Sequence, residues 1–368
     1  MAGPKAMDTV LTQLEGFNVP AAAWETEILP ARIGDYDPDW LDEQCLAGRF
    51  TWLRLRPHTR TNGEGKVAPL RTTPVAILPR RHSGLWMSLF APLDGPEPSS
   101  RALRVMETIE QYGASFFHDL LENSGLLQSQ LKEAIAELVA LGRVTSDSFA
   151  GLRALLVRSS GRRVHRRRHR DSNLFRMEDA GRWSLVRRKA DSIKEDPIEH
   201  VARTLLRRYG VIFRRLIERE AAWLPAWRDL LREYRRLESR GEIRGGRFVA
   251  GFSGEQFALP EAVANLREVR RQPDREEWAV VSGSDPLNLA GILTPGPKLA
   301  SLAGNRLVYR SGAPVAALAA GEITFFLELD PASEWQAQQL LLDGPIQAPS
   351  LAPELGAVGH RKFAHTRQ

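Results

Sequence analysis

The chain has 368 residues, of which 43% are hydrophobic and 26% charged, and its formal net charge is +6. This length allows two or three domains with separate cores, and no apolar run approaches the roughly 18 residues that a membrane-spanning helix needs. The N-terminus lacks the apolar core of a secretory signal, so the sequence predicts a cytosolic protein with no membrane partner. The single Cys45 and the absence of a His-Glu-x-x-His motif argue against a disulfide or a metal site.

Positive charge is concentrated in one third of the chain. Residues 153–247 hold 27 Lys and Arg against 13 Asp and Glu, an excess of +14, whereas the remainder carries −8. Such an asymmetry is typical of a polyanion-binding surface, and nucleic acid is the first candidate. A solvated charged face is the alternative, although such faces usually mix both signs.

The first predicted unit, residues 1–98, is a winged-helix-like module with a hairpin linker. Capping residues and apolar spacing indicate helices over residues 8–14, 21–33 and 40–46, followed by a strand at residues 50–53. Beyond a Gly- and Pro-rich linker, two apolar segments favour a hairpin. These segments are residues 75–78 and 85–90.

A second module is predicted over residues 99–160. Its helices begin at Ser99 or Ser100, at Phe116 and at Leu127, and a strand begins at Val144. The linker that follows, residues 161–195, contains six arginines and two histidines within nine residues, a density of like charge that cannot pack in a core. We expect these arginines to bind phosphates. They are Arg162, Arg163, Arg166, Arg167, Arg168 and Arg170.

Trp183, near the end of this linker, has two possible roles. Its basic neighbours would let it stack on a nucleobase. Anchoring the linker on a neighbouring domain is the favoured alternative.

Residues 196–275 contain the most informative pattern. Asp196 and Pro197 begin a helix that reaches Gly210, and a short helix is expected at residues 213–220. A third helix begins at Pro225 and places apolar residues on one stripe. Two short β segments follow Gly241, joined through glycines. Three helices and a glycine-rich hairpin predict a winged helix.

The third helix of this module is basic away from its apolar stripe. We therefore expect the helix and the hairpin to contact phosphates. The candidate residues are Arg228, Arg232, Arg235, Arg236, Arg244 and Arg247.

The junction of helix, glycine and strand occurs three times, at Gly48, Gly142 and Gly241, with spacings of 94 and 99 residues. This repeat predicts three winged-helix-like modules in tandem. In the first two modules the third helix is acidic or mixed in charge, so we expect these modules to act as scaffold or protein-contact surfaces.

Residues 276–345 are rich in predicted strands, and a closing helix is expected at residues 334–342. A small antiparallel β-barrel or half-barrel is the expected outcome, ahead of a loose basic tail at residues 346–368. The predicted fold class is α+β, with tandem winged-helix modules followed by this β domain. Asp285 stands at a Pro-bounded turn at the mouth of the predicted sheet.

Seven sequence blocks together span nearly the whole chain. The longest is residues 238–260, and the others are residues 13–17, 23–25, 113–117, 145–155, 207–211 and 285–289. These blocks resemble the C-terminal region of bacterial Lhr, the large helicase-related family of DNA repair helicases.

The resemblance implies a non-motor DNA-binding and assembly domain that self-associates at the bacterial nucleoid. Its expected partners are single-stranded or forked DNA and the helicase motor domains of a full-length protein. The sequence has no Gly-x-x-x-x-Gly-Lys-Ser/Thr loop. ATP and Mg²⁺ would therefore belong to the motor, and no cofactor is expected here.

The tandem plan is also similar, more distantly, to a class of alkylpurine DNA glycosylases, and the Lhr resemblance raises glycosylase activity on uracil as an alternative. Such an enzyme flips a base out of the stack and needs a carboxylate or amide to assist its excision. Asp285, Gln336 and Gln338 are the candidates, with turn formation and ordinary polar surface as the competing interpretations. A third alternative is an oligomerisation platform.

Overall fold

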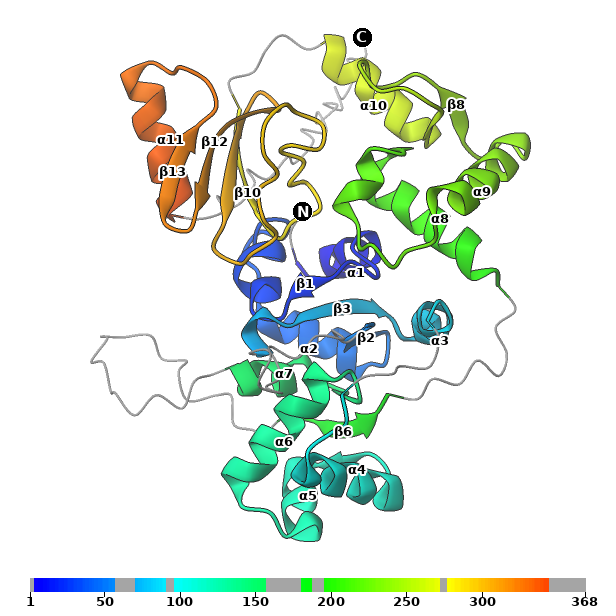
Figure 1. The fold of residues 1–368 in the computed structure, drawn as a ribbon, viewed down its shortest axis with the longest axis vertical. Helices are drawn as coiled ribbons and strands as arrows, with labels where there is room; N and C mark the ends of the chain where they lie inside the picture. The colour runs from blue at the N-terminus through cyan, green and yellow to red at the C-terminus, as the bar shows by residue number, and fades with distance from the viewer. Residues whose placement is uncertain are drawn as a thin grey trace, which may run out of the picture.

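The computed structural model describes residues 3–56, 70–90, 96–156, 180–186, 195–271 and 277–343. Within this part of the chain the strands form three small sheets of three strands and one sheet of four strands. Figure 1 shows the first module at the centre, with the second below it and the third module and the β domain above it. The predicted α+β class is confirmed.

The three small sheets share one topology. Each is antiparallel, and each places the last strand of its module between the first two. In chain order the strands are β1 (Val19–Pro20), β2 (Phe50–Leu53), β3 (Pro74–Pro79), β4 (Ser115–Phe116), β5 (Val144–Ser146), β6 (Arg182–Leu185), β7 (Val211–Phe213), β8 (Arg244–Gly246) and β9 (Gln256–Ala258). This common order identifies three winged-helix modules in tandem.

Glycine ends a helix at the same point in each module. Gly48, Gly142 and Gly241 have φ angles of 70°, 65° and 74°. Residues with a Cβ atom are strained in this left-handed region, so glycine permits the chain to leave the helix and enter the next strand. The predicted repeat of helix, glycine and strand is confirmed.

The first module contains α1 (Pro4–Gln13), a π-helix (Trp24–Ile28) and α2 (Pro38–Leu46). The prediction of a strand at residues 85–90 is wrong, because α3 (Ser83–Ser88) occupies most of this segment. Leu85, Trp86 and Met87 are all buried on this one short helix. An apolar run of this length does not distinguish a strand from a buried helix.

The second module contains α4 (Ser100–Tyr112), α5 (Phe117–Ser124), α6 (Gln128–Ala140) and α7 (Phe149–Leu156). Its sheet is completed by β6, so the module extends past the boundary expected at residue 160. Trp183 on β6 is fully buried and packs edge-to-face on Trp52 with ring centroids 6.2 Å apart. It therefore anchors the strand and is not available to stack on a base.

The third module contains α8 (Pro197–Tyr209), a 3-10 turn (Leu216–Arg219), α9 (Trp227–Ser239) and α10 (Pro260–Arg271). The Asp196 carboxylate caps α8 by accepting a hydrogen bond from the Ile198 N–H at 2.9 Å. The short helix expected at residues 213–220 is reduced to the 3-10 turn, because β7 takes its first residue. Helix α10 was not predicted; none of its residues is fully buried, and it packs on the core of the third module through the half-buried Ala262 and Val263.

The β domain is an open meander of β10 (Trp278–Ser282), β11 (Arg306–Arg310), β12 (Ala313–Ala319) and β13 (Glu322–Phe325). Within the described residues no strand joins β10 to β13, so of the two predicted forms the closed barrel is wrong and the sheet is open. The closing helix is α11 (Pro331–Asp343), whose Ala337 and Leu341 share a core cluster with Val308 and Val315 of the sheet. Helix α11 covers one apolar face of the sheet. In a closed barrel this face would be buried in the interior instead.

The strands of the first module contribute to two separate cores. Val75 and Ile77 of β3 belong to the core shared with the second module, whereas Ala76 and Leu78 belong to the core shared with the third. This alternation follows the two-residue period of a strand. The central sheet is thus covered on both faces.

In the part of the chain that the structure describes, no helix combines the length and the apolar character needed to cross a lipid bilayer.

Candidate nucleic-acid interface

Helix α9 is held in place by its apolar side. Leu230, Tyr234 and Leu237 are buried, and the Tyr234 ring stacks on Phe257 of β9 with centroids 5.4 Å apart. The Tyr234 hydroxyl also donates to the Ala202 carbonyl of α8 at 3.3 Å. Because an α-helix repeats every 3.6 residues, fixing this stripe turns the arginines of α9 outward.

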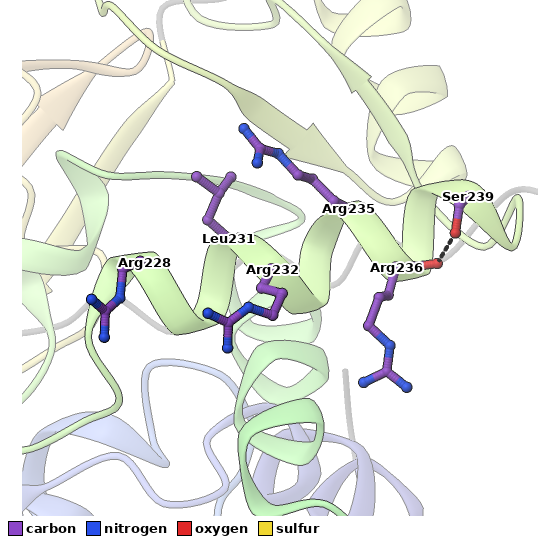
Figure 2. Close-up of a pocket in the computed structure, with 6 residues that line it drawn as sticks. All are labelled: Arg228, Leu231, Arg232, Arg235, Arg236 and Ser239. Atoms are coloured by element: carbon purple, nitrogen blue, oxygen red, sulfur yellow. Dashed lines mark hydrogen bonds between the residues drawn. The ribbon is translucent and has the colours of Figure 1, made fainter.

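The outward side of α9 is lined by arginines. The side chains of Arg228, Arg232, Arg235 and Arg236 are 85%, 68%, 60% and 49% exposed. With Leu231 and Ser239 they line a shallow groove of about 400 Å³ along the helix. Figure 2 shows Arg235 pointing toward the wing strands while Arg232 and Arg236 point to the other side of the helix axis.

Neighbouring carboxylates divide these arginines into two kinds. Arg235 makes two hydrogen bonds to Glu255, at 2.6 and 3.1 Å, and Arg236 contacts both oxygens of Glu233 at 2.8 and 3.0 Å. The hydrogen bonds from Arg235 hold the pKa of Glu255 below its usual value. Arg228 and Arg232 lie 3.6 and 3.9 Å from Asp229 and make looser pairs. These two guanidiniums are the more accessible to a ligand.

The wing adds two more exposed cations, Arg244 on β8 and Arg247 just after it. A second groove of about 480 Å³ lies between α9 and the wing, lined by Glu238, Arg247 and the wing glycines. A Cβ atom at Gly245 would lie 2.2 Å from Glu238 Oε1, so a larger residue there would displace this carboxylate. The absence of a side chain lets the Gly245 N–H donate to Glu238 Oε1 at 3.1 Å.

The predicted linker arginines, residues 162–170, lie outside the described residues. The other six predicted arginines are all exposed, four on α9 and two on the wing.

Asp285 is in a different place, on the turn after β10. It is 3% exposed, and its carboxylate accepts two hydrogen bonds from Arg32 at 2.5 and 2.8 Å and one from the Leu287 N–H at 2.8 Å. Arg219 of the third module donates to the Asp285 carbonyl at 2.6 and 3.0 Å. Asp285 therefore joins the β domain to the first and third modules. Arg32 and Arg219 could not be found from the sequence, because no local pattern marks a partner 253 or 66 residues away.

The two predicted glutamines lie on α11. Gln336 is exposed and Gln338 is half-buried. Asp285 and these glutamines therefore come from separate elements of the β domain, a turn and a helix.

A buried carboxylate joins the first module to the third. Glu15 Oε1 accepts hydrogen bonds from His82 Nδ1 at 2.8 Å, His200 Nε2 at 2.7 Å and Trp86 Nε1 at 2.8 Å. Among the described residues, Glu15, His82 and His200 form the one group close enough to hold a metal ion. The tryptophan N–H and Arg207, 3.6 Å from Oε2, favour an anion held by donors over a metal ligand.

Burial raises the pKa of Glu15. The hydrogen bonds from His200, His82 and Trp86, together with the charge of His200, lower the pKa by more than burial raises it. The net result is a pKa well below the usual range for glutamate. The carboxylate is therefore ionised, and it stabilises the joint between α1, α3 and α8. The sequence gives no local sign of this cluster, because its members come from three separate segments.

Comparison with known protein families identifies two of the three modules. Residues 1–80 match the third winged-helix domain of large helicase-related protein, and residues 191–278 match the fourth. These ranges agree with the first and third modules of the structure.

Two relatives align over most of the chain. One, from Mycolicibacterium smegmatis, is described as Lhr helicase and probable uracil glycosylase; it is 31% identical over 348 residues, which cover 89% of this chain and 22% of the relative. The other, Lhr helicase/uracil glycosylase from Escherichia coli, is 30% identical over 321 residues, covering 78% of this chain and 19% of the relative. The chain spans about a fifth of the length of these relatives. Together the two matched domains and the two relatives show a C-terminal domain of the large helicase-related (Lhr) type in this chain.

Proposed function

We propose that this chain binds DNA through α9 and the wing of its third winged-helix module. The observation that carries the proposal is the set of four exposed arginines along α9, together with the exposed Arg244 and Arg247 of the wing. Guanidinium groups bind phosphate oxygens in a planar, two-pronged geometry. A row of them can follow a phosphodiester chain.

The composition of this surface suits contact with the DNA backbone, and reading of base edges there would be limited mainly to arginine contacts with guanine. Its groove on α9 is lined by arginines, one leucine and one serine, and offers neither of the amide side chains, Asn and Gln, that pair with adenine. Phosphate contacts give affinity that depends on salt and hardly on sequence. The proposed partner is therefore DNA of any sequence, and the resemblance to Lhr makes its single-stranded or forked form the one to test first.

The test is a titration of fluorescein-labelled single-stranded, forked and duplex DNA, followed by fluorescence anisotropy at several salt concentrations. Replacing Arg228 and Arg232 with Glu should weaken binding on the order of 100-fold and lower the salt slope by about two. Loss of affinity should be similar for unrelated sequences.

The matched control reverses two exposed arginines of the second module, Arg101→Glu and Arg104→Glu on α4, which gives the same change in net charge. If both double variants weaken binding equally, the effect reflects overall charge and the assignment to α9 fails. Unchanged affinity and salt slope in the α9 variant would also contradict it.

The two relatives are described as helicases, and this chain spans about a fifth of each. We therefore propose that it acts alongside helicase motor domains of a longer protein. Self-association is a separate proposal, which light scattering of the purified chain at several concentrations tests directly. A monomer at every concentration would reject it.

Uracil excision is a second candidate function, favoured by the descriptions of both relatives as known or probable uracil glycosylases. Asp285 is the carboxylate proposed to act in it, with Gln336 and Gln338 as the amide candidates. In the structure both oxygens of Asp285 already accept hydrogen bonds from Arg32. Direct participation would require Arg32 to release one of them.

The corresponding test counts abasic sites after single turnover on uracil-containing DNA, compared with a control glycosylase. Asp285→Asn should abolish product while Arg32→Lys, which keeps a cation beside the carboxylate, retains it. Equal loss in both variants would indicate that Asp285 serves only to hold the β domain. No product from the unmodified chain would reject the activity.

A further inference from the structure

We propose that Gln256 is a positioning residue for DNA binding, whose buried amide fixes the wing loop that directly follows Arg247 and so sets where Arg244 and Arg247 stand relative to the arginines of α9. This inference rests on the proposed function. It assigns a role to a residue that does not itself reach the ligand.

The amide of Gln256 is fully engaged by the wing. The residue is 1% exposed, and its Oε1 accepts hydrogen bonds from the backbone N–H groups of Phe248 and Val249, both at 2.8 Å. Its Nε2 donates to the Val249 carbonyl at 2.8 Å. One buried side chain on β9 thus fixes two consecutive residues that directly follow Arg247. Buried polar groups are costly to leave unpaired, so this loop conformation is strongly favoured.

Two further contacts attach the wing to α9. Glu238 of α9 accepts a hydrogen bond from the Gly245 N–H on β8, and Arg235 of α9 pairs with Glu255 next to β9. Both strands of the wing are therefore tied to α9. Arg235 consequently has a structural partner in the wing, in contrast to Arg228 and Arg232.

The far side of the wing is attached to the core of the module. Phe252 packs on Phe213 of β7 with ring centroids 5.0 Å apart. Phe248 and Val249 are half-buried against the same core cluster. The loop between β8 and β9 is therefore held from inside the module as well as from α9.

A preorganised wing binds more tightly than a mobile one, because the loop does not lose conformational freedom when DNA arrives. The cations of the wing and of α9 then act as one surface. Without Gln256, Arg244 and Arg247 would still be present, but the wing would no longer hold them in a fixed position relative to α9. Their contribution to affinity should then be reduced.

A double-mutant cycle tests this coupling. Gln256→Met keeps the length and burial of the side chain and removes its hydrogen bonds, while Arg244→Ala with Arg247→Ala removes the wing cations. Each change alone should weaken binding of a labelled single-stranded DNA by about fivefold to tenfold. Gln256→Met should cause at most a twofold loss when the wing cations are already absent.

An additive cycle, in which Gln256→Met weakens binding equally in both backgrounds, would overturn the inference, as would full affinity of the single variant. If the unmodified chain does not bind DNA at all, the proposed function itself fails. Hydrogen exchange of the unmodified chain gives a test that does not require any variant to fold. The amides of Phe248 and Val249 should be protected, and exchange at the rate of an open loop would also overturn the inference.

Discussion

Helices α2 and α9 occupy the same position in two winged-helix modules, yet they face different environments. On α2, Asp42 accepts hydrogen bonds from Ser148 Oγ, from the Ala150 N–H and from Arg153 Nη1 of the second module. On α9, the arginines are turned to the surface and form a groove. The same helix of the winged-helix fold therefore contacts a neighbouring module where its residues are acidic, as in α2. Where its residues are basic, as in α9, it is exposed to an external anion.

The largest expected effect comes from breaking the contact of α2. Arg153 pairs with both Glu25 and Asp42, and all three side chains are 12–15% exposed. Arg153→Met should lower the free energy of unfolding by about 3–5 kcal/mol, because it leaves two buried carboxylates without their cation. Urea denaturation measures this change.

DNA affinity of the folded Arg153→Met variant should stay within about twofold of the unmodified chain, since the contact lies away from α9. A large loss of affinity in the folded variant would show that α2 and α9 are not separate in function.

A smaller effect is expected at the joint between the modules that carry these two helices. The pKa of Glu15 is depressed in the folded state, so the carboxylate contributes stability above its unfolded-state pKa near 4.5. This contribution is lost as the pH falls from that value toward the folded-state pKa.

Glu15→Gln should therefore reduce stability at pH 7 and flatten the decline in stability below about pH 4.5. Thermal unfolding at a series of pH values provides the measurement. If the stability of both proteins declined in parallel as the pH is lowered, protonation of Glu15 would not account for the loss of stability in acid.

The smallest predicted change concerns α9 itself. Glu255→Gln removes a carboxylate that faces Arg235, so the surface becomes more positive and Arg235 is released toward the ligand. DNA affinity should rise by about threefold, with a steeper salt dependence. Anisotropy at low and high salt measures both. A decrease would indicate that the bridge to the wing matters more than the added charge.

Local patterns in the sequence predicted the features that arise from local physics. The apolar stripe of α9, the capping of α8 by Asp196 and the three junction glycines follow from helix period and backbone preference, and the structure contains each of them. The six arginines of α9 and the wing could be found in the same way, because charge opposite an apolar stripe is visible in sequence.

Features that depend on distant partners could not be predicted. The pairing of Arg32 with Asp285 and the cluster around Glu15 join segments far apart in the chain. Gln256 was missed for another reason: it lies within a predicted strand, and nothing in the sequence shows that its amide turns toward the wing. Whether the β domain closes into a barrel or stays open could not be decided from the sequence, because strand patterns do not state whether the first and last strands meet.

The two-sided burial of β3 bears on how the chain is made. Ala76 and Leu78 pack in a core whose other members include Val201, Leu205 and Phe257. During synthesis, the first module therefore presents an apolar strand face until residues more than a hundred positions later have emerged. A fragment that ends before residue 195 would keep that face in water and should aggregate.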